Sequence, residues 1–345
     1  MQPVTDAPAA APSLSAWLAQ AQDRHADDPR AVADGLRARA PTLPADEDGA
    51  QALRLAEHVW LAHLGDPAGL AALAAALPAA WSDSAARPDA GPALARARIA
   101  WALALLAGQD PPPLAQAACW RALQNVVLAL AQQGRWAQAE ACLLANEAAA
   151  AACAASDAGR AYAASANNVA QDLQAGPRGD AARDHLMLVA AHLSQRAWAH
   201  AGTWLQQQRA EYRLALCHAV LGQVEAALAH ARRCLAACQA GDGQQPADAV
   251  AHFFAFEALA RAHHAANDVA GAAVAAGRMA ALLPAIDEAD GLRAWCEQPC
   301  TSCRALDAMP LTGARGPETK QPALGPACSQ CHGAAGPVRI TSGAS

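Results

Sequence analysis

Apolar residues recur at helical spacing through most of this chain, and Gly, Pro or Asn interrupts them at intervals. The spacing predicts amphipathic helices, because one face of an α-helix returns every three or four residues. We expect a first helix to begin near Ser13 or Ser15, and residues 40–49 to form a loop. Further helices are predicted over residues 53–64, 67–77, 93–107, 121–133, 136–150, 160–175, 210–221, 224–239, 249–266 and 269–283.

Two residue types predict where helices restart after a turn. Pro67 and Pro111 are expected at the starts of helices that return after Gly65 and Gly108, because the first helical turn needs no proline N–H. Asp180 is expected to cap the helix that follows it. These signals predict helices in antiparallel pairs.

The residues that end the helices are regularly spaced. Gly134, Pro177, Gly222 and Asn267 follow one another at 43, 45 and 45 residues, and Gly65 and Gly108 are also 43 apart. The interval of 26 residues from Gly108 to Gly134 breaks the series. A fixed interval between turns indicates one repeated helix pair, and stacked helix pairs form a solenoid.

A short motif accompanies three of these turns. A Gly or Asn is followed after two residues by a larger side chain and after five by Ala, as in Gly134/Trp136/Ala139, Gly222/Val224/Ala227 and Asn267/Val269/Ala272. The motif resembles the tetratricopeptide repeat over roughly residues 50–290, although that repeat is classically about 34 residues long. The longer period resembles bacterial regulators of the maltose-activator type and kinesin light chains, while HEAT repeats remain an alternative. The resemblance implies an all-α fold, a right-handed superhelix of antiparallel helix pairs.

Composition changes along the chain and indicates three segments. Residues 1–12 are rich in Ala and Pro and are predicted to be disordered, and residues 13–297 form the predicted repeat domain. Residues 298–345 lose the helical periodicity and contain Pro, Gly and Cys, together with Lys320, which is the only lysine. We expect a tail of low order there, and translation of a shifted reading frame is an alternative origin for it.

Charge and hydropathy narrow the class of protein. The net charge is −6 and no basic stripe occurs, so a nucleic-acid partner is not expected. No apolar run is long enough for a membrane span, and the N-terminus does not resemble a signal peptide, which favours a cytoplasmic protein. No phosphate loop or nucleophile–base arrangement occurs in the repeats, so we predict neither catalysis nor a cofactor.

In tetratricopeptide repeats the first helix of each pair lines the concave face, so the resemblance implies a binding groove there. Polar residues on those helices are therefore candidates for contacting a protein or peptide partner, the alternative being that they are solvated helix faces. They are Arg121, Gln124, Asn125, Asn168, Arg209, Tyr212, Arg213, Glu257, Arg261 and His264. The predicted function is that of a non-catalytic adaptor that binds a partner protein.

Cysteines in the C-terminal segment provide an alternative function. Cys300, Cys303, Cys328 and Cys331 form two Cys-x-x-Cys pairs, which is a ligand spacing of zinc sites. Cys328, Cys331 and His332 also match the attachment motif of c-type haem. The histidines of the repeats, among them His58 and His63, are scattered and match no metal motif, so no metal site is predicted from them.

Overall fold

The computed structural model describes residues 12–83, 91–241, 248–288, 292–294 and 296–297, and within them the fold is all-α with no strand. The α-helices are α1 (Leu14–Arg24), α2 (Pro29–Arg39), α3 (Glu47–His58), α4 (Pro67–Ala75), α5 (Ala80–Asp83), α6 (Gly91–Leu106), α7 (Gln116–Gln132), α8 (Trp136–Ala152), α9 (Asp157–Ala175), α10 (Ala181–Ala201), α11 (Trp204–Val220), α12 (Val224–Ala240), α13 (Ala249–Ala265) and α14 (Val269–Leu282). A π-helix, Val59–His63, continues α3, and short 3₁₀ turns cover Ala40–Thr42 and Leu283–Ala285.

Most helices begin where a short polar side chain accepts a hydrogen bond from the first turn. Asp180 accepts from the backbone N–H groups of Ala182 and Arg183, which confirms the cap predicted there. Equivalent caps occur at Ser13, Asp28, Asp46, Asp66, Ser156, Asp248 and Asp268. The helix boundaries therefore follow largely from local sequence.

Three of the predicted turns share one backbone geometry. Gly134, Gly222 and Asn267 have φ angles of 71°, 68° and 55°, in the left-handed region. The N–H of the residue after each turn residue donates to a carbonyl five positions back, which closes the helix in a Schellman motif. The sequence motif thus corresponds to a repeated structural turn.

Three predicted boundaries are wrong. Residues 40–49 are not one loop, because α3 begins at Glu47 under the Asp46 cap. No helix returns after Gly108: residues 110–115 are non-helical and α7 begins at Gln116, which accounts for the short interval to Gly134. The run Pro111–Pro113 removes backbone donors and disfavours helical conformation before each proline. Finally, α11 begins at Trp204 rather than at residue 210 because Thr203 and Gln206 form a capping box.

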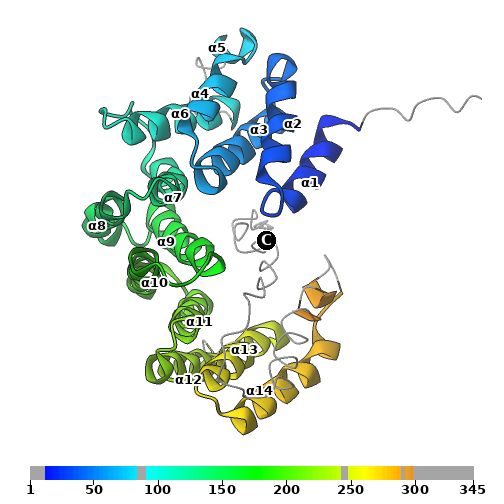
Figure 1. Cartoon of the computed structure of the whole chain (residues 1–345), viewed down its shortest axis with the longest axis vertical. Coiled ribbons are helices and arrows are strands. Elements are labelled where there is room, and N and C mark those ends of the chain that lie inside the picture. Colours follow the sequence, from blue (N-terminus) through cyan, green and yellow to red (C-terminus); the bar gives the residue numbers. More distant parts are fainter. Residues whose placement is uncertain (1–11, 84–90, 242–247, 289–291, 295, 298–345) are drawn as a thin grey trace, which may run out of the picture.

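Consecutive helices pack against each other, and from α7 onward alternate helices also touch. Helix α7 contacts both α8 and α9, α9 contacts α10 and α11, and α11 contacts α12 and α13. Figure 1 shows the outcome as an arc, with α7, α9, α11 and α13 along its inner side and α8, α10, α12 and α14 outside them. Helices α1 to α3 form one end of this arc.

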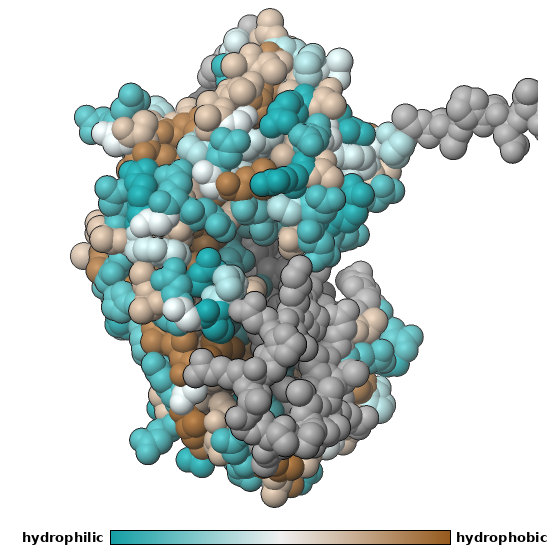
Figure 2. Space-filling model, viewed as in Figure 1, coloured by the Kyte–Doolittle hydropathy of each residue, from teal (hydrophilic) through white to brown (hydrophobic). Residues whose placement is uncertain are grey.

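A large apolar core fills the spaces between the helices from α1 to α11. Its largest fully buried side chains include Trp60, Trp81 and Trp120. Smaller clusters, made mostly of Ala with Phe253 and Met279, lie around α11 to α14. Hydrophilic residues cover most of α1 to α3 in the view of Figure 2. No helix in the described ranges is long and apolar enough to cross a membrane.

Candidate functional site

Polar side chains on the inner helices form a connected row. On α7, Asn125 bonds His58 of α3 at 2.9 Å, while Gln124 accepts a hydrogen bond from Asn168 of α9 at 3.0 Å. Arg213 of α11 reaches back to α9 and donates to Gln171 and Gln174 at 2.6 and 2.7 Å.

The same row continues to the next inner helix. Tyr212 of α11 donates to Glu257 of α13 at 2.8 Å, and Arg261 donates to the same carboxylate at 2.8 Å. The row therefore runs from α3 to α13 and crosses every inner helix between them.

Most of the sequence-predicted groove residues belong to this row: Gln124, Asn125, Asn168, Tyr212, Arg213, Glu257 and Arg261. Asn125, Arg213 and Glu257 are buried, so their side chains support the row instead of projecting from it. Gln124 and Asn168 are half-buried, as is the row residue Gln171.

The other three candidates lie apart from the row. Arg121 is exposed and pairs with the exposed Asp157 at 2.7 Å, which is the solvated arrangement anticipated as its alternative. Arg209 is half-buried on α11, and His264 is exposed near the end of α13. The helical repeat pattern placed them on inner helices but gave no information on their exposure.

Three histidines meet at the α3 end of the row. His25 is the C-cap of α1, His58 ends α3 and His63 ends the π-helix. One ring nitrogen of each lies within 4.8 Å of those of the other two, and the Nε2 atoms of His58 and His63 are 3.2 Å apart. His25 is buried, while His58 and His63 are half-buried.

Hydrogen bonds at the Nδ1 atoms of His25 and His58 orient these two rings. His25 Nδ1 lies 2.5 Å from the carbonyl oxygen of Gln22, and His58 Nδ1 lies 2.9 Å from Asn125 Oδ1. The Asn125 amide donates in turn to Glu57, whose fully buried carboxylate also pairs with Arg98 at 2.9 Å. This chain of contacts fixes the His58 ring against α6 and α7.

Burial keeps these imidazoles neutral. Desolvation is the largest cause that lowers the pKa values of His25, His58 and His63, since it disfavours the charged form. Repulsion from the other two rings adds to it at His63, whose pKa falls to about 3. At neutral pH each ring therefore keeps one unprotonated nitrogen, which carries a lone pair.

One acid of α9 faces this group. Burial raises the pKa of Asp172 to about 7, while Arg213, His25 and a hydrogen bond with Gln124 oppose the shift. Asp172 Oδ2 and Arg213 Nε are both buried and lack a hydrogen-bond partner. Both atoms are shielded from solvent, so they belong to the packed interface between α9 and α11.

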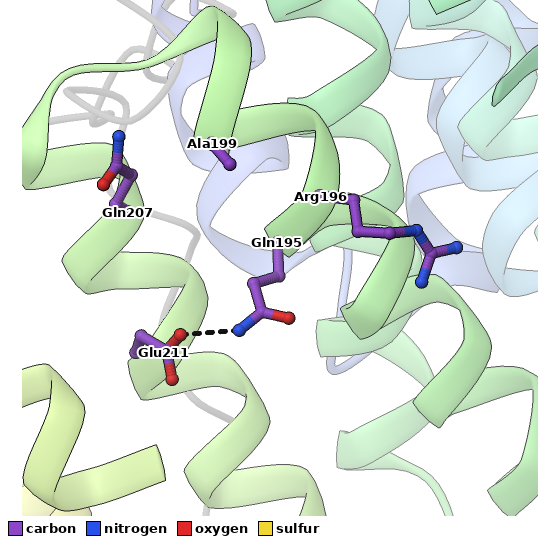
Figure 3. A pocket seen from close by; sticks show the side chains of 5 residues that line it. All are labelled: Gln195, Arg196, Ala199, Gln207 and Glu211. Carbon is purple, nitrogen blue, oxygen red and sulfur yellow. Dashed lines mark hydrogen bonds between the residues drawn. The ribbon is translucent and has the colours of Figure 1, made fainter. Parts of the chain in front are cut away.

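A second polar group lies between α10, α11 and α12. Glu211 accepts from Gln195 at 2.6 Å and from Arg233 at 2.9 Å, and its other contact is His230 at 2.7 Å. Figure 3 shows Gln195 and Glu211 beside Arg196, Ala199 and Gln207 in a pocket between α10 and α11. His218 stacks on His230, while His192 meets His218 edge to face and lies tilted against His230.

Sequence reasoning missed the histidine group. His58 and His63 are five residues apart, and in an α-helix with 100° per residue they would point about 140° away from each other. His25 lies on another helix, and nothing in its local sequence indicates a ligand. The π-helix brings His58 and His63 together, and the sequence gives little indication that a π-helix forms there.

The predicted cysteine ligands Cys300, Cys303, Cys328 and Cys331 lie outside the described residues. Within them, Cys234 and Cys238 share one face of α12 and are buried, and burial raises the pKa of Cys238 to about 11. They are small buried thiols that pack as apolar side chains.

Comparison with known proteins provides no relative. No family model, no curated protein and no solved structure matches the chain.

Proposed function

We propose that this protein is a non-catalytic adaptor, built as a tetratricopeptide-like solenoid, whose inner face binds an extended segment of a partner protein. The observation that supports the proposal is the polar row from α3 to α13, in which at least one hydrogen bond joins each inner helix to the next. A row of this kind matches a ligand that runs across the helices, as an extended polypeptide would.

The chemistry of the row suits a polypeptide backbone. Asn and Gln side chains carry both a donor and an acceptor, which is what a peptide group requires. Gln124, Asn168 and Gln171 are half-buried, so each retains surface from which it can bond a ligand. Asn168 donates to Gln124, and Gln171 accepts from Arg213. These bonds hold the side chains in place, so that binding a ligand costs less conformational entropy.

The occupied face can be identified by photo-crosslinking in the native host. A photoreactive amino acid replaces Gln171 on the inner face of the full-length chain, and in a matched variant it replaces the exposed Leu144 on the outer helix α8. We expect a discrete adduct at position 171 and none at position 144. Equal crosslinking at both positions, or adducts only at 144, would contradict an inner binding face.

Alanine substitutions then measure the contribution of the row. Each lost hydrogen bond is worth about 0.5–1.5 kcal/mol, so Gln124→Ala and Gln171→Ala should each weaken binding of the crosslinked partner about 2- to 12-fold. Arg232→Ala, at an exposed position on the outer helix α12, is the control and should leave the affinity unchanged. Charge reversal of Arg213 is unsuitable, because this buried guanidinium also holds α9 and α11 together.

A further inference from the structure

A π-turn brings two histidines onto one face of a helix. The N–H of Leu64 donates to the carbonyl of Val59, five residues back, and this wider turn follows directly on α3. It converts a spacing that would separate His58 from His63 into one that places their Nε2 atoms 3.2 Å apart. Single π-turns of this kind occur frequently at functional sites.

The distances fit three imidazoles arranged about one point. In a tetrahedral zinc site with bonds of about 2.0–2.1 Å, neighbouring nitrogens are about 3.3 Å apart. The ring centroids, which lie about 1.1 Å behind the ligating nitrogens, are then about 5.2 Å apart. Here the centroids of His25, His58 and His63 are separated by 5.2, 5.2 and 4.8 Å.

The hydrogen bonds behind the rings determine which nitrogens are free to bind. Because the amide nitrogen of Asn125 donates to Glu57, its oxygen faces His58, and His58 Nδ1 must carry the proton. His25 Nδ1 faces a carbonyl oxygen and must also carry one. Nε2 of both rings is therefore left with its lone pair, in the arrangement by which second-shell acceptors orient metal-binding histidines.

We propose that His25, His58 and His63 bind one divalent transition-metal ion, with zinc the ion that their geometry suits best. Neutral imidazole is a ligand of Zn²⁺, Cu²⁺ and Ni²⁺, and the 3.2 Å nitrogen separation matches a tetrahedral edge. His63 Nε2 faces His58 Nε2, so His63 releases this nitrogen for the metal by moving its proton to Nδ1. Closure of the His25 ring completes the three-nitrogen set and leaves the fourth position to water or a ligand from the inner face.

The other histidine group has a different geometry. His218 and His230 are stacked, with 8° between their planes, so their rings do not point toward a common centre. Nδ1 of His230 lies against Glu211, and Nδ1 of His218 lies against Gln223. Among the described residues, a group of three potential ligands close enough to share an ion is found at His25, His58 and His63.

Cobalt(II) titration of the full chain tests this proposal, because visible d–d bands report tetrahedral coordination and sulfur-to-metal charge transfer reports thiolates. We expect one high-affinity cobalt per chain with nitrogen and oxygen ligands, displaced by an equimolar amount of zinc. His25→Ala, His58→Ala and His63→Ala should each remove this spectrum. A chain in which Cys300, Cys303, Cys328 and Cys331 are all Ser should retain it.

Two controls separate ligand loss from misfolding. His264→Ala, at an exposed position outside the group, should bind cobalt as the wild type does. His63 is half-buried, and circular dichroism of its metal-free Ala variant should match that of the wild type. The proposal is overturned if cobalt binding survives all three substitutions, if its spectrum is that of thiolates, or if folded wild-type protein binds none.

Discussion

His58 and His63 lie with their Nε2 atoms 3.2 Å apart although five residues separate them along one continuous helical segment. The π-turn between them accounts for this contact, and His25 of α1 completes the group from outside the segment. The inner face of the protein thus begins at three neighbouring histidines and continues as a row of hydrogen-bonded side chains that includes the ion pair of Arg261 and Glu257.

Asn125 positions His58, so removing its amide should weaken metal binding without removing a ligand. We expect Asn125→Ala to bind zinc about 10- to 100-fold more weakly than the wild type, the usual effect of losing such a partner. Competition against a fluorescent chelator measures the affinity. Arg121→Ala, at an exposed position on the same helix and paired with Asp157, is the matched control. An unchanged zinc affinity in Asn125→Ala would show that the hydrogen bond between Asn125 and His58 does not orient the His58 ring for metal binding.

The buried pair of Glu57 and Arg98 should be sensitive to removal of one partner. Arg98→Met leaves the fully buried Glu57 without its cation, and we expect a loss of about 3 kcal/mol in the free energy of unfolding. The double variant Glu57→Gln/Arg98→Met should recover most of this loss, because no unpaired charge remains. Urea denaturation measures the free energy of unfolding of the single and the double variant.

An exposed ion pair supplies the comparison for that measurement. Arg54→Met breaks the contact with Glu47, and there we expect a change below about 1 kcal/mol. Equal losses in Arg98→Met and Arg54→Met would mean that burial does not govern the Glu57 pair.

Two Gly→Ala substitutions, one in a left-handed turn and one within a helix, should change the stability of the protein in opposite directions. Gly222→Ala should cost about 1 kcal/mol, since an L-residue with a Cβ is strained at a φ of 68°. Gly277→Ala should instead stabilise the protein by about 0.5–1 kcal/mol, because this helical glycine has open space around its Cβ position. Thermal unfolding of the two variants tests the turn assignment, and stabilisation by Gly222→Ala would refute it.

The group of His192, His218 and His230 should make the free energy of unfolding decrease in mild acid. Burial is the largest cause that lowers the pKa values of His192 and His218, and the neighbouring His230, Arg196 and Arg233 add repulsion. The unfolded chain then binds protons at a higher pH than the folded chain, so the free energy of unfolding decreases as pH falls through 6.5. Hydrogen bonds that His192 and His218 make to Gln195 and Gln223 oppose these pKa shifts without reversing them.

Substitution of one member tests that pH dependence. His192→Gln should flatten the decline in urea midpoint between pH 7 and pH 5, while His200→Gln, at an exposed position on α10, should leave it unchanged. The facing Glu211 keeps its charge in this range, because its contacts with His230, Gln195 and Arg233 outweigh burial and lower its pKa. A decline that is equally steep in His192→Gln would exclude this group as its source.

The helical architecture could be predicted from the sequence because its signals are local. Asp180 caps its helix through its own side chain, and Gly134, Gly222 and Asn267 determine their turns through φ angles that few residues adopt. The return helix expected at Pro111 failed for an equally local reason, the run of three prolines.

The candidate site could be predicted only in part. Placement of Gln124 and Asn168 on inner helices followed from the repeat pattern, but the burial of Arg213 and Glu257 depends on neighbouring helices. The convergence of His25 with His58 and His63 requires both a π-turn and the packing of α1 on α3. Neither the π-turn nor this packing can be derived from helical periodicity. A regular α-helix would place His58 and His63 on different faces.

Anomalous diffraction from crystals of the full chain grown with zinc, recorded on both sides of the zinc absorption edge, tests the central claim most directly. The account predicts one strong peak within bonding distance of the ring nitrogens of His25, His58 and His63. A difference map without a peak there, or with zinc bound only at cysteines, would contradict it.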